Sequence, residues 1–198
     1  MRNTFSLFQS HLDLAHSYWA NAVQKGDIVI DATCGNGYDT LKLCQLALFP
    51  AFGKVYAIDI QPQAIHATHK YLEHHLSSDL MQQVEIQQRC HSIFPSCIES
   101  DSVKMIVYNL GYLPGGNKNK TTMRDTTLLS LQNAQTILKP EGLICVTCYP
   151  GHPEGAMEQE MILTYISQLS PREWSCCHHT WLNRKQAPSL LIIQKAIQ

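Results

Sequence analysis

The chain has 198 residues, of which 44% are hydrophobic and 16% are charged, and this length favours a single domain with a substantial core. The formal net charge of −1 gives no sign of general nucleic-acid binding, although it leaves room for a local basic patch. No apolar run reaches the length of a membrane span and the first residues lack the apolar region of a signal peptide, so we expect a cytoplasmic protein with no membrane partner.

The first half of the chain alternates between helical and extended patterns. Buried-face positions, His11 among them, recur at helical spacing over residues 5–24 and predict an amphipathic helix that ends near Lys25 and Gly26. This helix could cap a sheet, shield a ligand or form a dimer face. After it we expect a strand at 27–32, a glycine turn at 35–37, a helix at 38–48, a strand at 54–59 and a helix at 62–76 that starts with proline.

The second half continues the alternation and ends differently. We expect strands at 84–88, 103–108, 143–148, 174–182 and 189–195, a short helical connection at 92–99, helices at 126–138 and 154–169, and a turn at 139–142. Such alternation predicts a parallel sheet with helices on both faces. The last two strands have no helix between them and predict an antiparallel hairpin at the sheet edge. We therefore predict an α/β, Rossmann-like domain: a seven-stranded, mostly parallel sheet at 27–198, preceded by an extra N-terminal helix at 1–25.

The eight cysteines do not predict a metal centre. Cys145 and Cys148 have C-x-x-C spacing inside a predicted strand, where residues three apart point to opposite faces and do not chelate one ion. The run Cys176-Cys177-His178-His179 contains ligand types, but it lacks a second ligand pair at a zinc-site spacing. We expect reduced cysteines and no structural metal.

A glycine-rich turn, D-A-T-C-G-N-G at 31–37, connects a predicted strand to a helix. Its glycines allow close approach of a ligand, and the helix N-terminus offers N–H groups to a carboxylate. A full dinucleotide fingerprint has a third glycine where this chain has Thr40, which weakens an NAD-binding interpretation. S-adenosylmethionine has no pyrophosphate and does not need that glycine. Asp59 ends the second predicted strand and can accept both ribose hydroxyls of either cofactor.

Other positions extend this predicted cofactor site. Asp39 can hold the amino group of the methionine part, Gln61 lies within reach of the same ribose, and Cys90-His91 follows the third strand, where the adenine is commonly contacted. The alternative is a plain turn with Asp39 as an ordinary acid at a helix N-terminus. The predicted S-adenosylmethionine-binding residues are Asp31, Gly35, Asn36, Gly37, Asp39, Thr40, Asp59, Ile60, Gln61, Cys90, His91 and Asn109.

A second polar segment, N-L-G-Y-L-P-G-G-N-K at 109–118, follows the buried strand at 103–108. The Asn109 amide oxygen can accept from an amine N–H and orient its lone pair, and Tyr112 can stack on a flat base or close a pocket. This corner resembles the amino-group site of methyltransferases, where prolines often stand between the two residues. Here they are Leu110 and Gly111, which argues against direct methylation of a base amine such as that of adenine. An ordinary strand-end loop is the alternative.

Further candidates flank this segment. His152, in Y-P-G-H-P-E-G at 149–155, can accept a proton, bind a phosphate or simply serve a turn. Several basic residues can contact phosphates, although a solvated charged surface is the commoner explanation. The predicted catalytic residues are Asn109, Tyr112 and His152, and the predicted substrate-binding residues are Tyr112, Pro114, Gly115, Lys118, Lys120, Arg124, His152, Arg184 and Lys185.

Taken together, the motifs at 31–40, 59–61, 90–91, 109–118 and 149–155 resemble the MnmM (YtqB-like) family of class I methyltransferases, long labelled rRNA methylases. The resemblance implies S-adenosylmethionine-dependent methylation of the aminomethyl group of 5-aminomethyl-2-thiouridine at the tRNA wobble position. It also implies contacts with the tRNA anticodon stem-loop, and cofactor contacts from Asn36, Asp39, Asp59, Gln61, Cys90 and His91. Family members tend to have serine at the position of Cys90, whose thiol is a weaker hydrogen-bonding group.

Other functions remain open from the residues alone. A methyltransferase of this fold could act on rRNA or on a small molecule. A tRNA-binding module without catalysis would not need the acidic and glycine positions of the first turn, and an NAD-dependent oxidoreductase would be expected to keep the third glycine. The sequence does not choose between a monomer and a homodimer, nor does it identify the group that takes a proton from the substrate.

Overall fold

The computed structural model describes residues 10–111 and 122–197. Within these ranges seven segments form strands, and most agree closely with the expected ones. The strands are β1 (Ile28–Asp31), β2 (Lys54–Asp59), β3 (Val84–Gln88), β4 (Val103–Asn109), β5 (Leu138–Cys148), β6 (Trp174–His179) and β7 (Ser189–Lys195). The helices in the same ranges are α1 (His11–Ala22), α2 (Tyr38–Ala47), α3 (Pro62–Glu73), α4 (Ser78–Met81), α5 (Arg124–Ile137) and α6 (Pro153–Ile166).

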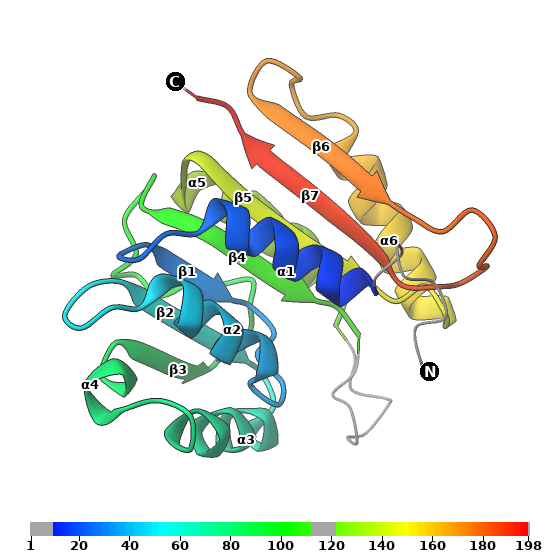
Figure 1. Cartoon of the computed structure of the whole chain (residues 1–198). Coiled ribbons are helices and arrows are strands. Elements are labelled where there is room, and N and C mark those ends of the chain that lie inside the picture. The colour runs from blue at the N-terminus through cyan, green and yellow to red at the C-terminus, as the bar shows by residue number, and fades with distance from the viewer. Residues whose placement is uncertain (1–9, 112–121, 198) are drawn as a thin grey trace.

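All seven strands belong to one sheet, in the order β3-β2-β1-β4-β5-β7-β6 (Figure 1). Strands β1 to β5 pair in parallel, whereas β7 runs antiparallel to both of its neighbours. The predicted α/β fold, with a mostly parallel sheet and an antiparallel hairpin at its edge, is therefore confirmed. The carboxyl ends of β1, β2 and β4 lie together at one end of this sheet, which is where open α/β sheets bind ligands.

Helices cover both faces of the sheet and enclose two hydrophobic layers (Figure 1). Helices α1, α2 and α3 pack on one face, and α5 and α6 pack on the other. Side chains alternate between the faces along each strand, so Cys145 lies in the first layer and Cys148 in the second, as predicted. Among the described residues, His, Cys, Asp and Glu side chains form no group of three that could hold a metal ion.

Helix α1 lies across the sheet beside α2, and its contacts reach β4, β5 and β7. A reciprocal capping box starts it, because the Ser10 hydroxyl accepts from the Asp13 N–H and the Asp13 carboxylate accepts from the Ser10 N–H. Ala15 and Trp19 of this helix are buried, as is Val23 directly after it. Capping the sheet is thus one role of this helix.

Three segments differ from the expected ones. Residues 92–99 form turns rather than a helix, since Pro95 has no N–H to give to a helical hydrogen bond and serines favour local turns. The short helix α4, which starts at the Ser77 cap, was not expected. The predicted turn at 139–142 lies within the bounds of β5, as an irregularity at which the pairing with β4 shifts register and Glu141 takes a φ of 60°.

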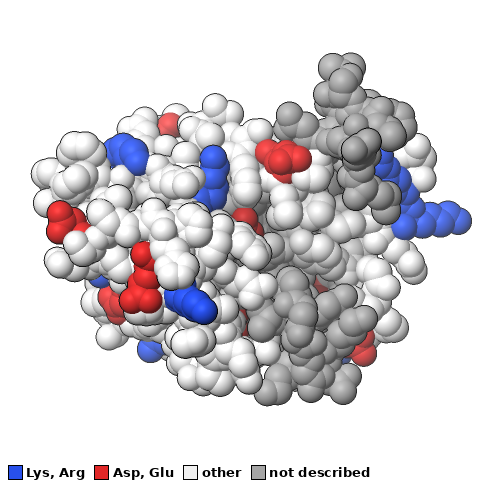
Figure 2. Space-filling model, turned by 60° about the horizontal axis from the view of Figure 1, so that its bottom comes forward, with Lys and Arg blue, Asp and Glu red and all other residues white. Residues whose placement is uncertain are grey.

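Most charged side chains on the face shown in Figure 2 are well separated from one another. Basic and acidic side chains are scattered among uncharged ones, with a basic group at the right edge of the view. This agrees with the net charge of −1. No helix in the described parts of the chain is long and apolar enough to span a membrane.

Candidate active site at the carboxyl ends of the strands

The glycine turn between β1 and α2 is closely packed against its neighbours. The Cys34 N–H donates to the Ile58 carbonyl of β2, and the Gly37 N–H donates back to the Cys34 carbonyl. Gly37 has a φ of 85°, and a Cβ atom there would lie 3.0 Å from the Thr68 Cα atom of α3. Glycine at position 37 is therefore required both by the backbone conformation and by the space available.

Asp59, at the end of β2, faces this turn. Its Oδ2 atom accepts from the Gly35 N–H at 3.1 Å, and its Oδ1 atom accepts from the Gln61 N–H at 2.9 Å. Burial raises the pKa of this carboxyl, while the backbone donors act in the opposite direction. Each carboxylate oxygen keeps a further lone pair for a ribose hydroxyl. Ile60 beside it is well exposed and offers an apolar surface to a flat ring.

Asp31, at the end of β1, is buried beneath the turn. It accepts from the Thr33 N–H at 3.2 Å and from the Thr40 hydroxyl at 2.6 Å. Burial raises its pKa to about 7, and the nearby charge of Asp39 acts in the same direction. Thr40 replaces the third glycine of a dinucleotide fingerprint and is itself buried, so its hydroxyl serves to hold Asp31.

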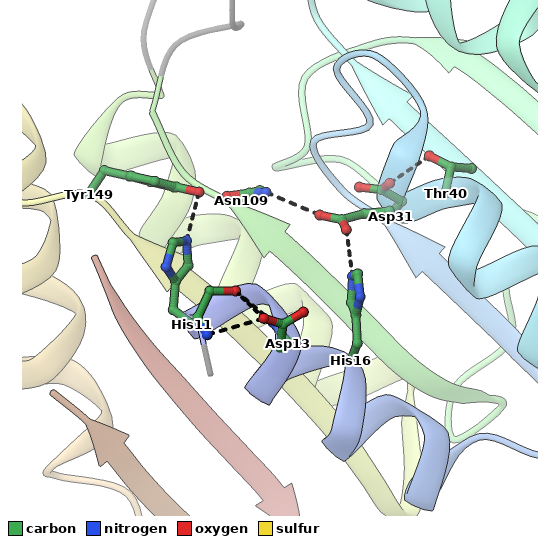
Figure 3. A network of polar contacts seen from close by, with 9 residues as sticks. His11, Asp13, His16, Asp31, Thr40, Asn109 and Tyr149 are labelled. Atoms are coloured by element: carbon green, nitrogen blue, oxygen red, sulfur yellow. Dashed lines mark hydrogen bonds and ion pairs between the residues drawn. The ribbon is translucent and has the colours of Figure 1, made fainter. Parts of the chain in front are cut away.

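Asn109 ends β4, and its side chain contacts Asp39 in the first turn of α2. Its Nδ2 atom donates to Asp39 Oδ2 at 3.1 Å, while the other end of the amide faces the Tyr149 hydroxyl (Figure 3). The Asn109 N–H donates to the Thr33 hydroxyl at 2.7 Å, so the backbone at this corner is held as well. The other Asp39 oxygen lies 2.9 Å from Nε2 of His16, on α1. The predicted acceptor and cofactor positions Asn109 and Asp39 are thus in direct contact.

Tyr149, which follows β5, reaches the same corner. Its hydroxyl lies 3.2 Å from Nε2 of His11 at the start of α1, and its side chain points toward Asn109 (Figure 3). Burial raises the pKa of Tyr149 to about 12, the charge of Asp39 acts in the same direction, and a hydrogen bond to the Asn109 side chain opposes both. Side chains of α1 and side chains at the strand ends therefore form one polar cluster.

The loop that starts after Asn109 is anchored by a buried carboxylate on α6. Leu110 is buried in the core, and Gly111 exchanges two hydrogen bonds with Thr122: its N–H donates to the hydroxyl and its carbonyl accepts from the Thr122 N–H. The Thr122 hydroxyl donates in turn to Glu158 at 2.7 Å, and the Thr127 hydroxyl donates to its other oxygen at 2.6 Å. Gly111 has a φ of 139°, which explains a glycine here.

The remaining predicted residues have varied settings. The His91 ring packs against Tyr108 and lies 3.5 Å from the Thr127 hydroxyl, and burial lowers its pKa to about 4. Cys90 accepts a hydrogen bond from the Ser92 hydroxyl. His152 caps α6, with its Nδ1 atom accepting from the Gly155 N–H at 3.1 Å. Tyr112, Pro114, Gly115, Lys118 and Lys120 lie outside the described residues.

Three predicted basic contacts belong to described segments. Arg124 is the first residue of α5, and the Arg184 guanidinium lies 4.3 Å from the centre of the Trp181 ring in the connection between β6 and β7. Lys185 follows in that connection, which starts at the same end of the sheet as Asn109 because β6 runs parallel to β5.

Sequence reasoning did not identify His11, His16, Tyr149 or Glu158 as site residues. A usable signal existed for two of them. Glu158 shares a helical face with Gly155 and Ile162, so an acid falls on the buried side of α6. His11 likewise occupies the buried face of a predicted helix. The contact between His11 and Tyr149 joins residues 138 positions apart and needs the fold to become visible.

Comparisons with known proteins agree with this arrangement. Residues 55–195 match the family described as "Putative rRNA methylase". This chain belongs to that methylase family. The crystal structure of a Clostridium thermocellum protein with the same description is 32% identical, covers 95% of this chain and 98% of its own, and has a TM-score of 0.88.

Two further relatives carry more specific descriptions. A Streptococcus mutans structure, described as that of a methyltransferase in complex with S-adenosylhomocysteine (SAH), is 26% identical over 95% of this chain and 99% of its own, with a TM-score of 0.80. A chloroplast protein of Arabidopsis thaliana, described as a tRNA (mnm(5)s(2)U34)-methyltransferase, is 43% identical over 92% of this methylase and 68% of the relative. Both agree with the predicted family and with S-adenosylmethionine as cofactor, so this methylase is an S-adenosylmethionine-dependent methyltransferase.

Proposed function

We propose that this methylase transfers a methyl group from S-adenosylmethionine to the aminomethyl nitrogen of 5-aminomethyl-2-thiouridine at the tRNA wobble position. The product is the 5-methylaminomethyl nucleoside. The observation that carries the proposal is the contact of Asn109 with Asp39, because it joins a residue suited to an amine with the turn suited to the cofactor. The Arabidopsis relative, described as a methyltransferase for this nucleoside, supports the choice of substrate.

The residues of the first turn fit the proposed cofactor. Asp59 would hold the ribose hydroxyls, Asp39 would take the amino group, and the glycine at position 37 leaves the first N–H groups of α2 without a side-chain cap. S-adenosylmethionine supplies an electrophilic methyl group to the reaction. In this arrangement Asp31 and Thr40 support the turn from beneath.

An alkyl amine suits the other half of the site. Its nitrogen must lose a proton before it can attack, because such amines are largely protonated at neutral pH. The Asn109 amide oxygen would accept from the remaining N–H and so aim the lone pair. Gly111 and the buried Leu110 give this corner a different shape from a proline-containing loop, which favours a flexible aminomethyl arm over a ring amine.

Contacts with the tRNA would come from several segments around this corner. We place the anticodon stem-loop against Arg124, Arg184 and Lys185, together with the segment that contains Lys118 and Lys120. The Arg184–Trp181 pair offers a charge and a ring to a phosphate and a base. A homodimer, a cytoplasmic location and a catalytic role for His152 or Tyr112 stay predictions.

The test is incubation of the protein with labelled S-adenosylmethionine and tRNA that carries the aminomethyl group. Label should enter the wobble nucleoside, and tRNA without the aminomethyl group and ribosomal RNA should stay unlabelled. Label in ribosomal RNA alone would favour the activity named in the family description.

The variant Asn109→Ala separates the two halves of the site. We expect it to lose at least about 10²-fold in turnover, while SAH still binds with a measurable affinity in calorimetry. Loss of SAH binding would refute the assignment of Asn109 mainly to the substrate.

A further inference from the structure

Helix α1 contributes side chains to the substrate corner. His11 opens the helix and His16 follows one turn and a half later, and their Nε2 atoms lie 3.2 Å from the Tyr149 hydroxyl and 2.9 Å from Asp39 Oδ1 (Figure 3). Tyr149 and Asp39 both contact Asn109. The helix that caps the sheet is therefore also part of the polar cluster around the proposed amine site.

On the basis of the proposed function, we propose that the Tyr149 hydroxyl takes the proton from the substrate ammonium group and passes its own proton to Nε2 of His11. In this assignment Tyr149 is the catalytic residue, and His11 completes the relay. The relay starts beside Asn109 and ends at His11, the first residue of α1.

The proton transfer balances within these groups. One N–H bond of the ammonium breaks, and its electron pair stays on nitrogen as the lone pair for attack. The proton forms a new bond to the Tyr149 oxygen while the original hydroxyl proton moves to His11, so the tyrosine ends neutral and the histidine becomes an imidazolium. His11 is half-buried and can then release this proton to solvent.

The charge states of the two groups suit these roles. Burial lowers the pKa of His11, so its ring is neutral at neutral pH, while Asp13 on its own helix and Asp39 on α2 pull in the opposite direction and would stabilise the imidazolium. Burial keeps Tyr149 neutral as well, with a pKa raised to about 12. A tyrosinate is therefore scarce at neutral pH, so Tyr149 takes the substrate proton only as its own proton moves to His11.

The contacts of His152 give a reason to assign the proton transfer to Tyr149 rather than to His152. The Nδ1 atom of His152 accepts from the Gly155 N–H and caps α6, so protonation at that atom would remove the cap. The His11–Tyr149 pair can move a proton without breaking a helix cap, since α1 is capped by Ser10.

Single-turnover methylation by the full chain, with saturating S-adenosylmethionine and tRNA, tests the relay through Tyr149→Phe and His11→Gln. Glutamine keeps a hydrogen-bonding group near the hydroxyl, but its amide is not protonated at pH 7 or at pH 10. We expect rates at pH 7 to fall by about 10²-fold in both variants, with unchanged SAH binding in calorimetry. The defect should shrink toward pH 10, where solvent deprotonates the amine.

A matched control is available on the same helix. The Tyr18 hydroxyl lies 2.8 Å from Nε2 of His179 on β6, so Tyr18→Phe also removes a tyrosine–histidine contact of α1. This variant should keep the wild-type rate and pH profile. A rate loss in Tyr18→Phe equal to that in Tyr149→Phe would assign the effect to helix docking and overturn the relay.

Two other results would overturn the relay without touching the proposed function. One is wild-type methylation of the wobble nucleoside together with variants that stay within about twofold of it at pH 7, or whose defect is the same at every pH. The other is an NMR titration of the cofactor-free protein in which His11 is protonated at pH 7. Failure of the wild-type protein to methylate this tRNA would instead contradict the proposed function.

Discussion

Three acids in and around the glycine turn have separate structural tasks at the scale of single residues. Asp59 binds backbone N–H groups at the proposed ribose position, Asp39 bridges α1 and Asn109, and Asp31 is sealed beneath the turn with Thr40. Because Asp31 is buried near another acid, its charged form is disfavoured. We therefore expect the stability contributed by Asp31 to depend on pH, a property that the sequence motif alone does not indicate.

The variant Asp31→Asn tests this sensitivity. The pKa of Asp31 is raised from 3.8 to about 7 in the folded protein, so between these values the unfolded chain ionises first and the folded state loses stability as pH rises. The free energy of unfolding of the wild type, relative to Asp31→Asn, should fall by on the order of 3 kcal/mol from pH 4 to pH 8. Urea denaturation at several pH values measures it, and a difference that is independent of pH would contradict the burial argument.

Single residues differ in how far the sequence could predict them. Asp59 and Asn109 end buried strands and carry suitable chemistry, so pattern and position were enough to find them. The contacts between site residues were harder to predict. Asp39 was expected to bind the cofactor, but in the structure it also contacts His16 and Asn109. Tyr149 and His11 come from opposite parts of the chain, and only the packing of α1 across the strand ends brings them together.

At the scale of elements, α6 supports the paired residues Gly111 and Thr122 through one buried acid. Glu158 accepts hydrogen bonds from Thr122 at the end of the loop and from Thr127 on α5. Burial raises the pKa of Glu158, against the effect of these two hydroxyls. The position of the loop base therefore depends on how α5 and α6 pack.

We expect Glu158→Gln to loosen this anchor, because the amide keeps only one acceptor oxygen for two donors. The free energy of unfolding should fall by about 1–2 kcal/mol, and the KM for tRNA should rise several-fold with little change in SAH binding. Chemical denaturation, steady-state kinetics and calorimetry measure these effects. Glu160→Gln, on the exposed side of α6, is the matched control and should resemble the wild type. An unchanged KM for tRNA in Glu158→Gln would contradict the anchoring role.

Elements were predictable where the hydrophobic pattern was strong. The strands β2, β3 and β7 match their expected bounds because continuous or alternating apolar runs mark them clearly. The segment at 92–99, predicted as a short helical connection, forms turns, because Pro95 and the neighbouring serines favour turns. Helix α4 is only one turn long and depends on its cap at Ser77, a signal too local for a periodicity argument.

At the scale of the whole molecule, one sheet separates two apolar layers, and its strand ends bring the two halves of the site together. The alternation of helices and strands predicts a mostly parallel sheet, but it does not predict the order of the strands. In particular, it does not show that β7 lies between β5 and β6. The two layers also separate Cys145 from Cys148, so hydrophobic packing rather than metal binding accounts for both cysteines.

Chelation tests this account of stability. Extended treatment with a strong zinc chelator should leave the Tm within about 1 °C of the untreated protein, because the described residues offer no group of three metal ligands. Differential scanning fluorimetry of the purified wild-type protein measures the Tm, so no cysteine-free variant is needed. A Tm that falls markedly, and recovers when zinc is restored, would contradict it.

The central claim is methyl transfer to the aminomethyl nitrogen of the wobble uridine. Incubation with S-adenosylmethionine carrying a trideuterated methyl group, followed by digestion of the tRNA and mass spectrometry of its nucleosides, tests it most directly. We predict a single deuterated product, 5-methylaminomethyl-2-thiouridine, formed at the expense of the aminomethyl nucleoside. Persistence of the aminomethyl nucleoside, with the deuterated methyl group found on another nucleoside or on none, would contradict the claim.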